Sequence, residues 1–183
     1  MTWTASVSGD ERLRLFLALR IPDDVLEEIE GWQRAQLAAV RTVPREHLHI
    51  TLAFLGRRPA GDVEPIVGAL RAAAAGAGEI SLTPVRYRET RSVGMLVLAD
   101  DGGRAALLAG DIQERLERLG VYRREGRPWL PHLTVARWRE RPRLQLEPPS
   151  VRTFVPSDAA AYLSRLHPGG ARYEVLESVA LGG

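Results

Sequence analysis

The sequence predicts an α+β fold, with an α/β fold built on mixed sheets as the alternative. Segments with alternating apolar residues interleave with segments whose apolar residues recur at helical spacing. Further strand-like segments gather toward the C-terminus, and together these observations favour α+β. The chain has 183 residues, of which 45% are hydrophobic. That length suits a single domain that buries about 70% of its unfolded surface.

The first half of the chain is predicted to alternate strand and helix twice. Leucines alternate with other residues over 13–18, which is the pattern of a buried strand. Apolar residues then recur at helical spacing over 24–39 and predict a helix. The apolar segment 47–55 predicts a second strand. Asp62 is placed to cap a second helix, which ends near Gly76.

The second half is predicted to contain most of the strands. Residues 79–87 resemble a strand, and Pro84 within it predicts an edge strand or a bend. Apolar residues recur at helical spacing over 108–119 and predict a helix that Gly120 stops. A proline-rich loop is expected over 141–150. The other predicted strands are 95–99, 133–138, 154–155, 162–166 and 173–181.

Composition excludes several kinds of chemistry. The chain has no cysteine, which rules out disulfides, a cysteine nucleophile and thiolate metal sites. All 25 basic residues are arginine, so neither a P-loop lysine nor a Schiff-base mechanism is available. Arginine's planar fork suits phosphate groups, although genome composition explains the same bias.

The N-terminus has neither the basic region nor the apolar region of a signal peptide. Residues 1–10 are expected to form a flexible tail, followed by one domain over 11–183. No apolar run approaches the roughly 18 residues of a membrane span. We therefore expect a cytoplasmic, monomeric protein without membrane contact.

Two short segments share the pattern histidine, apolar, threonine, apolar. The pattern begins at His49 and again at His132, in a chain with four histidines. Because side chains alternate faces along a strand, His49 shares a face with Thr51, and His132 shares one with Thr134. A single such pair is most often structural, whereas two copies in strand context predict one shared site.

The two pairs predict a site for a phosphoryl group. If the two strands face each other across a pseudo-twofold axis, two imidazoles and two hydroxyls converge. Imidazoles suit acid–base catalysis near neutral pH, because their unperturbed pKa is about 6.5. Threonine hydroxyls can hydrogen-bond the non-bridging oxygens of a phosphate.

The paired motifs resemble those of the two-histidine (2H) phosphoesterase superfamily. Within it, the chain resembles the RNA 2′,3′-cyclic phosphodiesterases, also called 2′-5′ RNA ligases. Four stretches of the chain resemble that family. They are the opening strand before Pro22, the first motif as far as Gly56, residues 127–132 before the second motif, and the segment 164–173. The similarity extends over about residues 12–181.

The resemblance implies an α+β fold of two pseudo-twofold-related lobes, with mixed or antiparallel sheets lining a central cleft and helices packed outside. It implies metal-independent hydrolysis of RNA 2′,3′-cyclic phosphate ends to 2′-phosphomonoesters, with no cofactor. His49 is implied as the proton donor and His132 as the proton acceptor, an order that the residues alone do not give. Thr51 and Thr134 are implied to bind the substrate phosphate.

Arg137 is a site residue on which two arguments disagree. Simple alternation puts it on the face opposite His132, whereas the resemblance favours a phosphate-binding role. A surface ion pair is the alternative. Trp129 is a candidate for base stacking, with packing in the core as its alternative. His47 shares a face with His49, but we expect no metal there because no third ligand is evident.

Other functions stay open. ATP-independent 2′-5′ RNA ligation is an alternative as main or side activity, because the same residues can catalyse the reverse reaction. A non-catalytic RNA-binding module and an enzyme for another small cyclic phosphate are further alternatives. The pair Arg57-Arg58 is a candidate for a rim that receives RNA phosphates, with a solvated surface as its alternative. His167 is expected in a turn.

Overall fold

Two antiparallel four-stranded sheets and three α-helices make up the described part of the chain, so the α+β prediction is confirmed. The structure is a computed structural model, and it describes residues 11–168 and 170–182. The expected tail, residues 1–10, lies outside the described residues. No helix within the described ranges has the length and apolarity that a membrane crossing requires.

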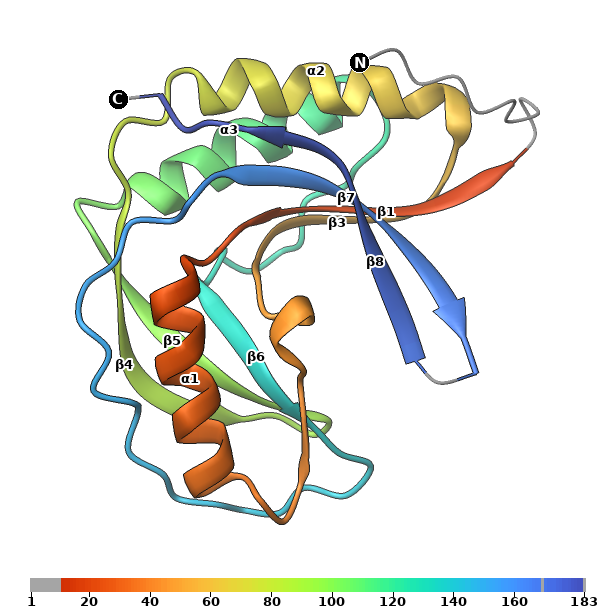
Figure 1. The fold of residues 1–183 in the computed structure, drawn as a ribbon. Coiled ribbons are helices and arrows are strands. Elements are labelled where there is room, and N and C mark those ends of the chain that lie inside the picture. The colour runs from red at the N-terminus through yellow and green to blue at the C-terminus, as the bar shows by residue number, and fades with distance from the viewer. Residues whose placement is uncertain (1–10, 169, 183) are drawn as a thin grey trace.

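The two sheets meet at an angle in Figure 1. In spatial order, the first sheet consists of β3 (Ile50–Pro59), β1 (Arg12–Leu19), β7 (Ala159–His167) and β8 (Gly170–Val179). The second sheet consists of β2 (Arg41–Thr42), β6 (His132–Arg137), β5 (Val93–Asp101) and β4 (Ser81–Glu89). Each sheet therefore contains one of the two motif strands.

The helices cover one face of each sheet and leave the other face free. Helix α1 (Asp23–Gln36) follows β1 in the chain but lies over the second sheet, whereas α2 (Val63–Ala74) and α3 (Arg104–Arg118) lie over the first (Figure 1). Ile29 of α1 and Ile112 of α3 are fully buried at these interfaces. Buried apolar residues from both sheets form one continuous cluster.

Strand β1 separates the core from the free face of the first sheet. Leu15, Leu17 and Leu19 are at most 3% exposed and belong to the main core. Their alternate neighbours Arg14 and Phe16 point to the other face, as the period of two requires. This alternation explains why a strand so rich in leucine also contributes to a cavity.

Each motif strand carries a β-bulge immediately after its threonine. In β3 the extra residue is Leu52, opposite β1, and in β6 it is Val135, opposite β5. An extra residue shifts the alternation of faces by one position. The side chains three places after the two threonines, Phe54 and Arg137, are exposed, while the residues between are buried. Both therefore return to the face of the histidines.

A buried glutamine supports each bulge from the helix behind it. Gln33 of α1 donates from Nε2 to the carbonyl of Val135 at 2.8 Å and to that of Val43 at 3.0 Å. Gln113 of α3 donates to the carbonyl of Leu52 at 3.0 Å. A buried carbonyl without a donor is costly, so each bulge depends on its glutamine.

One predicted strand is wrong. Residues 154–155 form no strand, because Phe154 makes only an isolated bridge with Leu82. Pro156 follows at once and has no N–H with which to extend a ladder. The prediction for the edge strand is confirmed: β4 lies at the edge of its sheet, with a register shift beside Pro84.

Smaller differences lie around the first motif. Helix α1 ends at Gln36 rather than at 39. The start of the predicted strand 47–55 belongs instead to the 3-10 helix η1 (Arg45–His47), and β3 begins at Ile50. A second 3-10 helix, η2 (Ala60–Asp62), leads from β3 into α2. His49 is thus the last residue before its strand, where the chain turns into the sheet.

Candidate active site

The two motif strands meet at one cavity of about 1030 Å³, lined by strands of both sheets. His49 and Thr51 reach it from the first sheet, and His132 and Thr134 reach it from the second. The structure therefore brings together the two imidazole–hydroxyl pairs that lie far apart in the sequence. Their shared cavity is the geometric condition on which a two-histidine mechanism depends.

Both imidazoles are held in the same way by their own backbone. Nδ1 of His49 lies 2.7 Å from the carbonyl oxygen of His47, and Nδ1 of His132 lies 2.8 Å from that of Leu130. A carbonyl only accepts hydrogen bonds, so Nδ1 carries a proton in each ring. The tautomer is thereby fixed, and Nε2 of each ring remains for exchange with a ligand.

The surroundings of His49 favour its neutral form. Loss of hydration lowers its pKa from 6.5 to about 4, and the positive charges of Arg137, His47 and His132 act in the same direction. The hydrogen bond to the His47 carbonyl opposes this by favouring the protonated ring. In these surroundings at neutral pH, Nε2 of His49 is therefore a hydrogen-bond acceptor.

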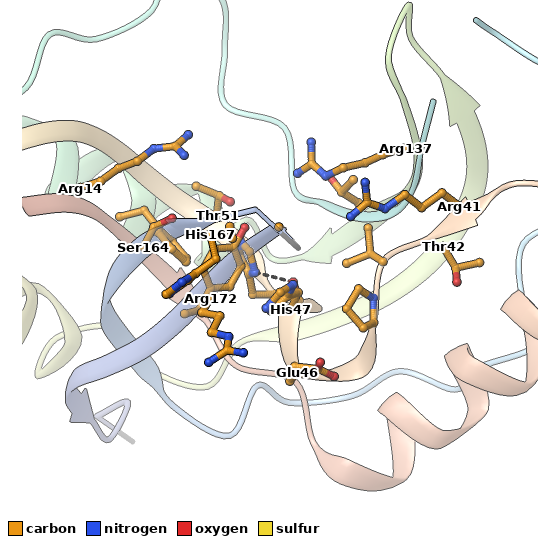
Figure 2. Close-up of a pocket in the computed structure, with 18 of the residues that line it drawn as sticks. Arg14, Arg41, Thr42, Glu46, His47, Thr51, Arg137, Ser164, His167 and Arg172 are labelled. Carbon is orange, nitrogen blue, oxygen red and sulfur yellow. Dashed lines mark hydrogen bonds between the residues drawn. The ribbon is translucent and has the colours of Figure 1, made fainter. Parts of the chain in front are cut away.

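Four arginines give the cavity a positive field. Figure 2 shows Arg14 on one side, Arg41 and Arg137 on the other, and Arg172 below the centre. None of the four forms an ion pair with a carboxylate in residues 11–168 and 170–182, and Glu46 is the one acidic residue among the described lining residues. Guanidinium groups without partners favour an anionic ligand.

Arg137 lies in the cavity, against the expectation from simple alternation. The bulge at Val135 shifts the parity of β6, so Arg137 projects on the same side as His132 and Thr134. The equivalent position of β3, after the bulge at Leu52, carries an aromatic ring in place of a guanidinium. The site is thus symmetric in its histidines and threonines but not in these two neighbours.

Trp129 does not line the cavity. Its ring is partly buried against the core, and its Nε1 donates to the carbonyl oxygen of Thr51 at 3.0 Å. This contact joins the segment just before the second motif to the backbone of the first motif. The structure therefore favours the packing role of Trp129 over base stacking.

Sequence patterns did not single out the aromatic residues around His49. The ring of Phe16 lies 4.8 Å from that of His49 and 4.8 Å from that of Tyr162, between centroids. Tyr173 packs edge-on against Phe16 at 4.9 Å. The signal was present in β1, where Phe16 alternates with leucines that face the core. The same alternation would have found Arg14.

All four histidines of the chain line the cavity. The ring of His47 packs against Tyr173 with centroids 4.4 Å apart. His167, expected in a turn, is instead the last residue of β7, paired with Gly170 and exposed. Imidazole and guanidinium groups together make a ligand with several negative charges the natural occupant.

Comparison with known proteins identifies a family. The family model described as the 2′-5′ RNA ligase superfamily matches residues 21–167. The RNA 2′,3′-cyclic phosphodiesterase of Escherichia coli K12 is 27% identical over 191 aligned positions, covering 93% of this chain and 98% of that protein. The protein of the same name from Methanocaldococcus jannaschii is 25% identical over 134 residues, covering 68% of this chain and 71% of its own.

Solved structures share the fold. Escherichia coli LigT complexed with 3′-AMP has a TM-score of 0.81 at 24% identity, with 94% of this chain and 100% of that chain covered. TT0787 of Thermus thermophilus has a TM-score of 0.81 at 25% identity, with 93% and 99% covered. Since the family model spans most of the sequence, the chain belongs to the 2′-5′ RNA ligase superfamily.

Proposed function

We propose that the protein hydrolyses RNA 2′,3′-cyclic phosphate ends to 2′-phosphomonoesters, without a metal ion. The observation that carries the proposal is the pair of imidazoles at one arginine-lined cavity, each with Nδ1 held by a backbone carbonyl. Relatives that bear the name RNA 2′,3′-cyclic phosphodiesterase support the choice of substrate.

In the proposed reaction, Nε2 of His132 accepts a proton from water as the water oxygen bonds to phosphorus. The bond from phosphorus to O3′ breaks, and Nε2 of His49 donates its proton to O3′. Each proton transfer contributes roughly 10²–10⁴-fold to the rate. Thr51, Thr134 and Arg137 would hold the phosphoryl oxygens in place while charge develops on them.

The donor role of His49 requires that the substrate raise its pKa. The protein alone holds that pKa at about 4, because the ring is desolvated and surrounded by positive charge. A bound phosphate introduces a negative charge beside the ring, and an opposite charge at this distance favours the protonated form. We infer that substrate binding itself charges His49, so the acid is produced only in the occupied site.

The first test uses a short RNA ending in a 2′,3′-cyclic phosphate, with a chelator present. The native protein should produce a 2′-phosphate, and His49→Ala and His132→Ala should each lower kcat by about 10²–10⁴-fold. The position of the product phosphate is read by NMR or by its resistance to 3′-phosphatase. Native-like turnover in both variants would refute the proposal.

A second substrate separates the acid from the base. If sulfur replaces O3′, the leaving group departs without a proton donor. His49→Ala should then recover most of its lost rate on the sulfur substrate, while His132→Ala should not. Recovery in the His132 variant alone would reverse the two assignments.

Ligation is the second candidate, and the name of the matched family favours it. Joining two RNA ends through a 2′-5′ bond is the same chemistry with a ribose hydroxyl in place of water. Because water is far more concentrated than any RNA end, hydrolysis should dominate. Incubation of a cyclic-phosphate RNA with a 5′-hydroxyl RNA measures the proportion joined.

A further inference from the structure

A second, smaller cavity of about 370 Å³ adjoins the first, at the end of the first sheet where β1 begins and β7 ends. The two cavities share Arg14, Ser164 and His167 in their walls. The second adds the arginines Arg12, Arg57 and Arg165 and one acidic residue, Glu11. A ligand that fills the active cavity therefore has a continuous path along β1 into another basic site.

Two arginines in this path lie directly opposite each other across the sheet. Arg14 of β1 is the direct cross-strand partner of Arg57 of β3. Like charges directly opposite each other in a sheet are destabilising. Neither forms an ion pair with a carboxylate in the described part of the chain, whereas Arg165 nearby pairs with Glu174 at 3.5 Å. An anion bound between Arg14 and Arg57 would relieve the repulsion.

The Arg14 guanidinium is already held in place. Its Cζ lies 5.0 Å from the centre of the Phe54 ring, in a cation–π contact. Arg14 is two residues along β1 from Phe16, a separation of roughly 7 Å, and the ring of Phe16 contacts that of His49. The distance from the arginine pair to the histidines is therefore about the length of one nucleotide along an RNA backbone.

We propose that Arg14 and Arg57 bind the phosphodiester that joins the terminal nucleotide to the one before it. This inference rests on the proposed function and makes it more specific. The substrate is then an oligonucleotide with a charged internal linkage, and a nucleoside cyclic phosphate occupies only part of the site. Single-stranded RNA would leave the active cavity along β1, with its backbone over the arginine pair.

The neighbouring residue Arg58 supplies a matched control. It has the same charge and is next in the chain, but it pairs with buried Leu13 across the sheet. Its Nε donates to the carbonyl of Leu55 at 3.3 Å, and it lines neither cavity. Arg57→Ala and Arg58→Ala therefore remove equal charge from the two faces of one strand.

The test compares two dinucleotides that end in a 2′,3′-cyclic phosphate. One has an ordinary phosphodiester and the other a neutral methylphosphonate between its nucleosides. The native protein should show a higher kcat/KM on the charged dinucleotide. Arg57→Ala should reduce this preference about five- to tenfold, and Arg58→Ala should keep it. An unchanged preference in Arg57→Ala, or an equal loss in Arg58→Ala, would overturn the proposal.

A binding measurement separates this proposal from the proposed function. If the native protein turned over no cyclic phosphate, the hydrolysis would be refuted, but an RNA trinucleotide ending in a 2′-phosphate would still probe the subsite. Arg57→Ala should then raise Kd about fivefold and reduce the slope of log Kd against log salt by about 0.7. Equal affinities and slopes for native protein and variant would refute the subsite as well.

Discussion

At the residue scale, one imidazole is kept neutral by the fold around it. The lowered pKa of His49, about 4, arises mainly from desolvation and also from the positive charges nearby. In the unfolded chain the same ring binds a proton near pH 6.5. Between these two values the unfolded state holds more protons than the folded one, so folding is weakened as the pH falls.

The native protein should therefore lose stability as the pH is lowered from 6.5 to 4, and His49→Gln should lose less. The other three histidines are present in both proteins and cancel in the comparison. Urea unfolding at pH 7 and pH 5 gives the two free energies of unfolding. If the change with pH is the same in both proteins, the neutral imidazole is not responsible. Adding inorganic phosphate should reduce the native protein's loss, because an anion stabilises the charged ring.

At the element scale, the two bulges decide which side chains enter the cavity. The one in β6 brings Arg137 beside His132, and the one in β3 brings Phe54 beneath the Arg14 guanidinium. A glutamine on a helix supports each bulge through a buried hydrogen bond. Side chains in the core thus control the geometry of the site without touching its ligand.

Gln113→Met keeps the volume of the side chain but removes the donor to the Leu52 carbonyl. The free energy of unfolding should fall by about 1–3 kcal/mol, because a buried acceptor is left without a partner. Gln36→Met, at the exposed end of α1, is the control and should change stability by less than about 0.5 kcal/mol. Urea denaturation measures both, and equal effects would show that the buried hydrogen bond contributes little.

Sequence patterns predicted the elements better than they predicted the pairing between them. The arrangement within each motif could be predicted because side chains alternate faces along a strand, so His49 had to share a face with Thr51. The face of Arg137 was not readable, because a bulge is defined by the partner strand, and β5 lies far from β6 in sequence. Only the family resemblance favoured a place for Arg137 in the site, and its phosphate-binding role stays a prediction.

At the scale of the whole molecule, a buried carboxylate fixes the long connection between the two sheets. The side chain of Glu89 is 2% exposed. It accepts hydrogen bonds from Arg141 Nε at 2.9 Å and from the backbone N–H groups of Arg143 at 3.0 Å and Leu144 at 2.8 Å. Burial raises its pKa, but these donors outweigh burial and hold the pKa below its usual value.

Glu89→Gln should lower the free energy of unfolding by about 1–3 kcal/mol. The amide NH₂ group of glutamine is a donor, and it would face N–H groups that now donate to the carboxylate. The depressed pKa means that the native carboxylate stabilises the fold above its usual pKa of about 4.5. That contribution is lost as the pH falls further. The difference in Tm between the two proteins should therefore shrink in strong acid. A difference that grows in acid would contradict this account.

The position of β1 has a consequence for folding. This strand ends at Leu19, yet its neighbour β7 begins at Ala159. Until β7 pairs with it, one side of an apolar strand has no partner, and such an edge promotes aggregation. Pairings between segments so distant also fold slowly. We therefore expect the first sheet, and with it the cavity wall that carries His49, to form only once β7 pairs with β1.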